Sequence, residues 1–145
     1  MKFRIVIDKE KDEEIVATVH EHCALIEEIE ALISRYTDRI PGYAEDEIKM
    51  LSVSEIECIT VLEGKTYAID SRNCQYRLKQ RLYELEDVLP ASFIRINKSA
   101  LANETQLDRF AVTYAGSVDA VFKCGYREYV SRRCFAQIKR RLEGK

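Results

Sequence analysis

The chain has 145 residues, which fits one domain or one domain with a small extension. Because 46% of the residues are hydrophobic and 33% are charged, the chain can bury a core and remain soluble. No apolar run approaches the ~18 residues that a membrane-spanning helix requires. The N-terminus lacks the long apolar stretch and the small-residue cleavage site of a secretory signal. These features argue against a membrane or secreted protein and favour a cytoplasmic one.

The charge is unevenly distributed along the chain. The formal net charge is −2, but residues 1–47 contain six Lys and Arg against thirteen Asp and Glu, a net charge of −7. Residues 48–145 therefore have a net charge of +5. Such asymmetry between segments hints that the basic part contacts nucleic acid, although many solvated surfaces are equally uneven.

The cysteines give no sign of a metal site or a disulfide framework. They are five in number, widely spaced, and contain no Cys-x-x-Cys pair: Cys23, Cys58, Cys74, Cys124 and Cys134. We expect reduced thiols that behave as small buried hydrophobes. A redox-sensing cysteine is the alternative.

The first 45 residues are predicted to form a small α/β extension. Residues 2–8 alternate well enough for a strand, and residues 15–20 are β-branched, as in a second strand or a helical lead-in. Residues 24–36 have apolar positions at helical spacing, and Pro41 and Gly42 are expected to end this unit. We expect the amphipathic helix to pack on the sheet of its own domain rather than on a partner.

The remaining residues predict a mainly β fold with short helices, a β-rich α+β class. Expected strands, separated by turn residues, are 48–51, 56–62, 66–70, 74–78, 93–97, 106–114, 118–123 and 126–130. One helix is expected at 79–89 and stops at Pro90. Another begins after an N-cap at Ser131 and runs to about Leu142.

No catalytic or metal-binding constellation is evident. The sequence contains no glycine-rich phosphate loop, no nucleophile elbow and no His-Glu-x-x-His motif. The spacing of His20 and His22 does not place both on one helical face, so we interpret them as surface histidines. We therefore predict no enzyme activity, no metal and no cofactor.

Basic and polar residues cluster at three expected loops of the β-rich part. The clusters are Lys65 at a hairpin tip, then Arg95, Asn97, Lys98 and Ser99, and then Ser131, Arg132 and Arg133. Lys and Arg can neutralise phosphates, and Arg can bind guanine edges in the major groove. The alternatives are an ordinary polar turn for the middle cluster and simple solubility for the cations, including the basic run 139–141 at the end of the last helix.

Two motifs in this part resemble the LytTR family of bacterial DNA-binding domains. The run LYELE at residues 82–86, followed by FIRINKSALAN at 93–103, resembles the family pattern L-x-E-L-E and then F-x-R-x-[HN]-[RKN]-S-x-x-[VA]-N. The run YVSRR at 129–133 resembles the [VI]-S-R-R element before the family's final helix. The resemblance covers about residues 46–143. It implies elongated antiparallel β-sheets packed face to face, with a short helix between them and a C-terminal helix.

The resemblance also implies a function and a set of site residues. Family members regulate transcription by inserting loops into successive grooves of DNA, usually at imperfect direct repeats. The corresponding contacts are Lys65, Lys98 and Arg133, with Asn97, Ser99 and Ser131 positioning the backbone and Arg132 beside them. Lysines at the first two positions depart from other members, so either could hold a phosphate instead of reading a base. Arg95 belongs to the motif as a support for the loop.

The resemblance suggests a stand-alone, response-regulator-like protein. Residues 1–45 are too few for a phosphoacceptor receiver domain, so we expect an acidic extension at 1–45 and a DNA-binding domain at 46–145. Expected partners are double-stranded DNA, a second protomer on DNA and a co-encoded membrane inhibitor. The extension is the expected surface for either dimerisation or inhibitor binding. The alternative is a protein-interaction or small-ligand sensory module that uses the same β domain without DNA.

Overall fold

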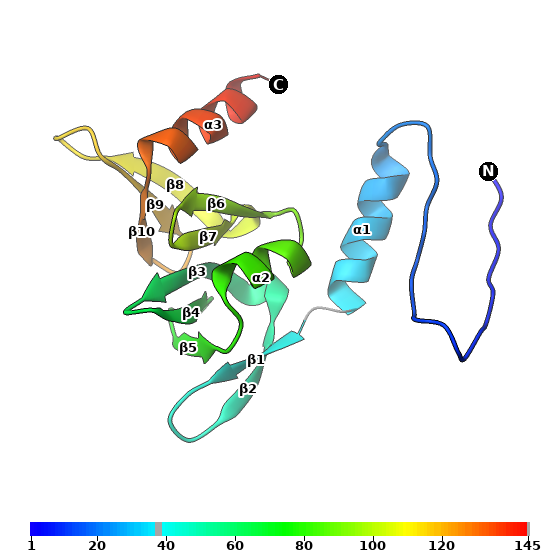
Figure 1. The fold of residues 1–145 in the computed structure, drawn as a ribbon. Helices are drawn as coiled ribbons and strands as arrows, with labels where there is room; N and C mark the ends of the chain where they lie inside the picture. The colour runs from blue at the N-terminus through cyan, green and yellow to red at the C-terminus, as the bar shows by residue number, and fades with distance from the viewer. Residues whose placement is uncertain (37–38, 145) are drawn as a thin grey trace.

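The computed structural model describes residues 1–36 and 39–144 (Figure 1). The helices are α1 (Ala24–Tyr36), α2 (Leu82–Val88) and α3 (Arg132–Glu143), with short 3-10 helices at Val53–Glu55 and Glu104–Gln106. The strands are β1 (Arg39–Tyr43), β2 (Ile48–Ser52), β3 (Ile56–Leu62), β4 (Lys65–Asp70), β5 (Gln75–Leu78), β6 (Phe93–Asn97), β7 (Ala100–Asn103), β8 (Leu107–Val112), β9 (Val118–Phe122) and β10 (Arg127–Val130). The predicted β-rich class with short helices is confirmed.

The strands form two antiparallel sheets. The larger sheet has seven strands in the order β2-β1-β5-β4-β3-β7-β6, and the smaller has three in the order β10-β9-β8. We call residues 39–144 the sheet domain and residues 1–36 the N-terminal segment. Short hairpins join most neighbouring strands, so few long connections separate the elements that meet in space.

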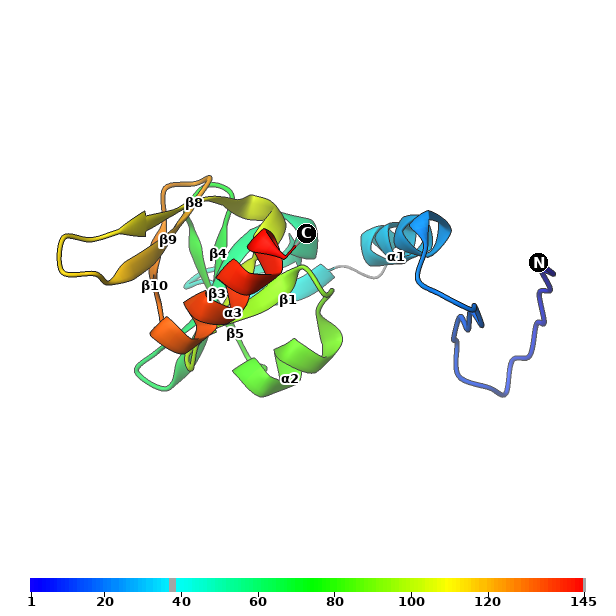
Figure 2. The same cartoon turned by 90° about the horizontal axis from the view of Figure 1, so that it is seen from above.

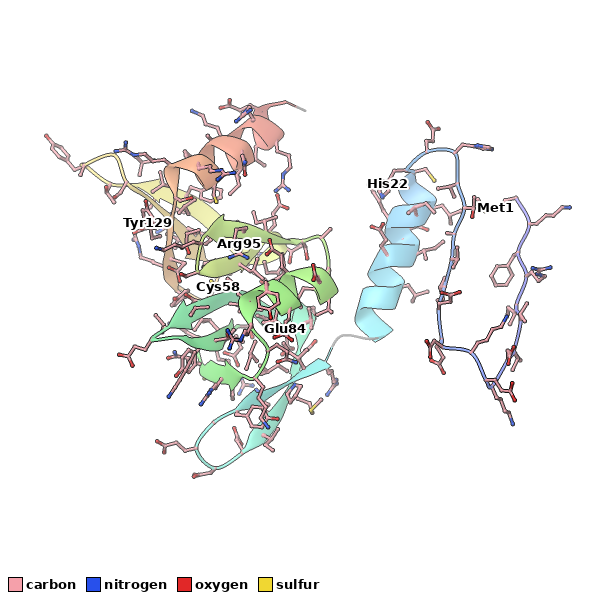
Figure 3. All side chains as sticks on the ribbon, in the orientation of Figure 1. Met1, His22, Cys58, Glu84, Arg95 and Tyr129 are labelled. Carbon is pink, nitrogen blue, oxygen red and sulfur yellow. The ribbon has the colours of Figure 1, made fainter. Side chains whose placement is uncertain are left out.

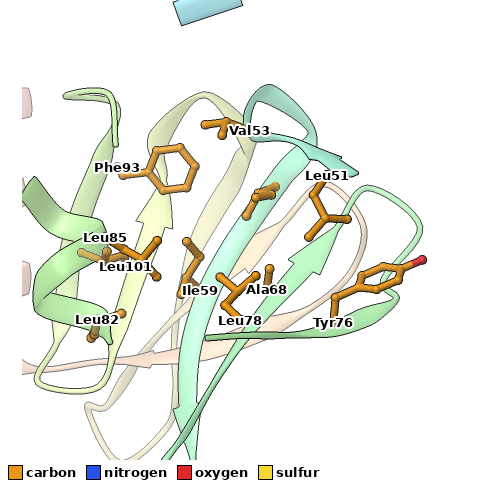
Figure 4. Close-up of a cluster of buried hydrophobic side chains, with 11 residues drawn as sticks. Leu51, Val53, Ile59, Ala68, Tyr76, Leu78, Leu82, Leu85, Phe93 and Leu101 are labelled. Atoms are coloured by element: carbon orange, nitrogen blue, oxygen red, sulfur yellow. The ribbon is translucent and has the colours of Figure 1, made fainter. Parts of the chain in front are cut away.

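Apolar side chains on both faces of the larger sheet create two cores. The first core packs α2 against this sheet around Ile59, Leu85 and Leu101 (Figure 4). The second lies between the two sheets and α3, and contains Cys58, Ile96, Phe122, Val130 and Ile138, among others. Because successive side chains of a strand point to opposite faces, neighbouring Cys58 and Ile59 on β3 contribute to different cores. This central strand is buried on both sides.

Strand β1 was not predicted, and its Pro41-Gly42 pair does not end a unit. Gly42 is buried, and a Cβ there would lie 2.6 Å from Leu51 Cδ1, so the position requires glycine for close packing. On one side, β1 pairs with β2 along its length, and Pro41 lies opposite Met50. On the other side, β1 pairs with β5 only where Tyr43 lies opposite Arg77. A residue without an N–H is tolerated at such an edge-like position. The sheet therefore extends upstream of residue 46.

The N-terminal segment differs from its prediction in two ways. Residues 2–8 and 15–20 are extended but form no strand, because they have no hydrogen-bonded neighbour in a sheet. Helix α1 forms where predicted, but Figures 1 and 2 both show it standing to one side of the sheets. Its Leu25 and Leu32 are 43% and 52% exposed. The expected packing of this helix on its own domain is therefore wrong.

Candidate nucleic-acid interface

The first candidate contact, Lys65, lies at the tip of the β3–β4 hairpin. Glu63 and Gly64 form the two-residue turn, with φ angles of 52° and 77°. Positive φ at both central residues gives a turn whose twist matches that of the flanking strands. Lys65 follows directly and is exposed. The tight turn therefore presents an ammonium group at the end of a well-ordered hairpin.

The β6–β7 loop, which contains Lys98 and Ser99, lies beside this hairpin. The backbone N–H of Val61 donates a hydrogen bond of 2.8 Å to the carbonyl oxygen of Ser99. Lys65 pairs with Leu62, the residue after Val61, so the hairpin tip is one residue pair beyond this contact. The two lysine-bearing turns consequently share one end of the larger sheet.

Asn97 joins the β6–β7 loop to the end of β10. Its Nδ2 donates a hydrogen bond of 2.6 Å to the carbonyl oxygen of Tyr129, and its Oδ1 accepts one of 2.7 Å from the Ser99 N–H. Next to it, the N–H of Ser131 donates to the carbonyl oxygen of Ile96 at 2.9 Å. Because Asn97 is buried and its amide is used inside the protein, its part in the interface is to hold two loops together.

Arg95 fixes the backbone that carries Lys98. Its Nη1 donates a hydrogen bond of 2.8 Å to the carbonyl oxygen of Lys98, and its Nη2 forms an ion pair with Glu86 on α2. Figure 3 places Arg95 on β6, on the side where α2 packs. The guanidinium therefore connects a helix to a loop, which matches the supporting role implied by the resemblance.

The third loop is the junction between β10 and α3. The Ser131 side chain accepts a hydrogen bond of 3.2 Å from the N–H of Cys134, so Ser131 caps α3 as the sequence predicts. Arg132 and Arg133 follow in the first turn, where no acidic residue is present. Cations at a helix N-terminus add to the positive end of the helix dipole. Such an arrangement is unfavourable alone and favourable beside an anion.

The β6–β7 loop and the start of α3 border a cleft with a volume of ≈ 740 Å³. It is lined by Arg95, Asn97, Lys98, Ser99, Glu128, Tyr129, Ser131, Arg133, Cys134 and Gln137. Five of the seven predicted site residues are thus brought together, while Lys65 and Arg132 lie outside the lining. Neither these two residues nor Lys98 or Arg133 forms an ion pair with a carboxylate in the described part of the chain.

Sequence reasoning missed two polar residues of the cleft. Gln137 lies one helical turn after Arg133, so i, i+4 spacing on the predicted helix would have placed both on one face. Glu128 brings a carboxylate to the cleft and accepts a hydrogen bond from the Tyr126 hydroxyl at 3.0 Å. The basic run 139–141 lies at the other end of α3, where Arg141 forms an ion pair with Glu104.

Other chemistries find little support among the described residues. Residues 1–36 and 39–144 contain no group of three or more His, Cys, Asp or Glu arranged to hold a metal ion. All five cysteines are free thiols. No described helix has the length and apolar character needed to cross a membrane. The interface formed by the three loops is the main functional candidate.

The sequence comparison decides the family. Residues 46–143 match the model of the LytTr DNA-binding domain. The chain belongs to the LytTR family. An uncharacterized HTH-type transcriptional regulator of Staphylococcus aureus (strain NCTC 8325 / PS 47) is 38% identical over 101 residues, which are 70% of this chain and 68% of the relative. A relative of the same description from the bovine strain RF122 / ET3-1 is 37% identical over the same length.

A solved structure confirms the LytTR fold. The LytTr DNA-binding domain of a Bacillus cereus protein superposes with a TM-score of 0.65 and 23% identity, covering 75% of this chain and 99% of that chain. The relatives are described as HTH-type, but in residues 1–36 and 39–144 strands separate every pair of successive α-helices. A helix-turn-helix requires two helices joined by a short turn. The described helices therefore form no helix-turn-helix.

Proposed function

We propose that this LytTR protein is a transcriptional regulator that binds double-stranded DNA at imperfect direct repeats. The β3–β4 hairpin, the β6–β7 loop and the start of α3 would enter successive grooves on one side of the duplex. The observation that carries this proposal is the hydrogen-bonded linkage of the β6–β7 loop to both neighbouring loops, through Ser99 and Asn97. Exposed cations without ion-pair partners in the described residues supply charge for phosphates.

The site residues divide into two roles under this proposal. Arg133 is assigned to a base edge, because a guanidinium can bind guanine O6 and N7 bidentately. Lys65 and Lys98 are assigned to phosphates, since an ammonium group reads charge better than base identity. Arg132, which is exposed beside Arg133, is assigned to a neighbouring phosphate through its positive charge. Asn97, Ser99 and Ser131 position these side chains through the contacts described above.

The proposal includes a cellular setting. The DNA-binding unit includes the whole sheet domain, because β1 pairs with β2 and β5 upstream of residue 46. The N-terminal segment is separate in function, and the protein acts in the cytoplasm, where bacterial promoters lie. Direct repeats would be occupied by two protomers. A co-encoded membrane inhibitor is the proposed regulator, and the acidic extension, with its net charge of −7 through residue 47, is its proposed docking point.

A footprint on the upstream region of the protein's own gene would find an operator, since such regulators often control their own operon. Binding to that operator and to a scrambled duplex is then measured by fluorescence anisotropy across salt concentrations. Arg133→Ala should reduce discrimination between the two duplexes by about 1–3 kcal/mol. Lys98→Ala should weaken binding to both and reduce the salt slope by about one.

The matched control is Arg140→Ala, which removes an exposed guanidinium from the far end of α3. It should leave discrimination unchanged. Equal affinity of the wild-type protein for all duplexes under competition would contradict the proposal and favour the protein-interaction or small-ligand module.

A further inference from the structure

The N-terminal segment exposes an unusual number of large apolar side chains. Ten in residues 1–32 are at least 38% exposed: Met1, Phe3, Ile5, Val6, Ile7, Ile15, Val16, Val19, Leu25 and Leu32. Isolated exposed apolar residues are common, but a dense group marks an interaction surface. These side chains occupy a short, continuous part of the chain.

The pattern of these residues is that of a hairpin followed by a helix. The segment reverses direction near Asp8, whose Oδ1 accepts a hydrogen bond of 3.0 Å from the Glu10 N–H, and Figure 1 shows the two extended arms running in opposite directions. If the arms paired across residues 8–14, the odd-numbered residues of both arms would share one face. Phe3, Ile5 and Ile7 would then lie opposite Val19, Ala17 and Ile15.

Helix α1 supplies a matching apolar stripe. Leu25, Ile29 and Leu32 recur at helical spacing, while exposed Glu27 lies on the opposite face of the helix. One hairpin and one helix of this size cannot form a stable core alone, because an isolated two-stranded hairpin is marginal in water. The segment therefore has apolar faces on its strands and its helix, but too few elements to bury them.

We infer that the N-terminal segment associates with the same segment of a second copy of this chain. Two hairpins and two α1 helices would form one shared apolar layer with two-fold symmetry. A two-fold interface brings the same surface of both subunits together. The apolar face of the arms and the apolar stripe of α1 can therefore pack against their own copies. Formation of this dimer does not require DNA. Only the binding of the dimer to direct repeats rests on the proposed function.

The exposed area is large enough for such a dimer. Burying one large aliphatic side chain removes roughly 60–120 Å² of apolar surface from water. Val6 and Val16 would lie on the opposite face of the paired arms. The other eight side chains therefore offer roughly 500–1,000 Å² per protomer, and a stable interface needs about 800 Å² per partner. The upper part of this range exceeds the roughly 300–600 Å² of the largest apolar patch on a typical monomeric protein.

The charges of the segment favour a protein surface over a lipid surface as the occupant. Residues 1–36 contain five Lys and Arg against nine Asp and Glu. A net charge of −4 would be repelled by anionic membrane lipids. Because Glu27 projects away from Leu25 and Leu32, two copies can join through the apolar stripe and leave this carboxylate in water.

The test measures the mass of the full chain in solution without DNA. Sedimentation equilibrium should give twice the monomer mass of 16.9 kDa for the wild-type protein at micromolar concentration. Ile5→Glu combined with Leu25→Glu places charges on both apolar faces and should raise the dimer dissociation constant at least about 100-fold. The matched control is Val6→Glu, on the opposite face of the same arm, which should remain dimeric.

Far-UV circular dichroism identifies any variant whose sheet domain fails to fold, and a second substituted pair, Ile7→Glu with Leu32→Glu, then replaces it. A monomeric wild-type protein would overturn the inference, including one that gains mass only with a membrane inhibitor. A dimer that survives both pairs of substitutions would also overturn it. A wild-type dimer without sequence discrimination would instead refute the proposed function alone, and a monomer that discriminates would refute the inference alone.

Discussion

The N-terminal segment and the sheet domain have similar alternating apolar patterns, but they use them differently. In the sheet domain, β3 is paired on both sides, and its Ile59 and Cys58 are fully buried in two cores. In the N-terminal segment, Phe3 and Ile7 alternate in the same way and are each 88% exposed. The comparison shows that an alternating pattern specifies a strand only where the chain also supplies neighbours for it.

Removing a buried side chain tests whether the apolar residues of the sheet domain stabilise the fold, as the comparison implies. Leu101 is fully buried in the first core, so Leu101→Ala should lower the free energy of unfolding by about 2–5 kcal/mol. Leu142→Ala, at a position 52% exposed on α3, should change it by no more than about 0.5 kcal/mol. Urea unfolding followed by circular dichroism measures both. Similar effects from the two substitutions would contradict the described core.

Asn97→Ala tests whether a buried polar side chain also holds the sheet domain together. The substitution leaves the Tyr129 carbonyl and the Ser99 N–H without their partner, which should cost about 1–3 kcal/mol of unfolding free energy. It should also weaken DNA binding by freeing the β6–β7 loop. Gln75→Ala, which removes an exposed amide on β5, should do neither. Unchanged hydrogen exchange at Ser99 would contradict the linkage.

Alkaline pH sharpens the comparison through the buried thiol on β3. Burial, and then the nearby Glu128 and Cys124, raise the pKa of Cys58 well above its ordinary value of 9.0. Because the folded state holds this proton more tightly, the stability contribution is complete below pH 9 and is lost as pH rises toward the folded pKa. The slope for one group is at most about 1.4 kcal/mol per pH unit.

Urea unfolding between pH 7 and pH 10 measures this loss, and Cys58→Ala should flatten the curve. Exposed Cys74 should react with a thiol reagent in the folded protein, whereas Cys58 should react only after unfolding. Rapid labelling of Cys58 in the folded state would show that the core opens readily, and would weaken the contrast with the N-terminal segment.

The smallest effect is expected at the start of α3. Ser131→Ala removes the side chain that caps the helix and should cost about 1 kcal/mol of unfolding free energy. Ser131→Asp keeps a capping oxygen and should preserve stability, but its negative charge should weaken DNA binding. Thermal unfolding and anisotropy measure the two properties. Equal DNA affinity of the Asp variant and the wild-type protein would place the interface elsewhere.

Local signals predicted much of the sheet domain. The strand at 56–62, the turn before Lys65 and the helix cap at Ser131 all depend on residues close in sequence, and the structure has them as predicted. Pro41 and Gly42 misled the prediction, because a turn pair and a tightly packed strand pair have the same local sequence. The distinction depends on Leu51, which approaches Gly42 from β2.

The candidate site was predictable in part. The resemblance named positions on three loops, but no sequence pattern shows that the Asn97 amide would reach Tyr129, 32 residues later. Likewise, the exposure of α1 could not be inferred from its amphipathic pattern, because that pattern is the same whether the apolar face meets its own sheet or a second chain. The sequence therefore predicts the helix, but it does not identify the surface against which the apolar face packs.

The hydrogen bonds of Asn97 have a consequence for how a duplex can be read. Together with the Ser131–Ile96 backbone bond, they fix the distance between the β6–β7 loop of the larger sheet and the start of α3, which follows β10 of the smaller sheet. Each additional base pair moves a groove position by about 3.4 Å along the duplex. Because the spacing between the two protein elements is fixed, the domain cannot lengthen to match such a shift. Inserting one base pair between the contacts of these two elements should therefore abolish one of the contacts. Asn97→Ala, which leaves only the Ser131–Ile96 backbone bond between them, should reduce the loss of affinity that the insertion causes.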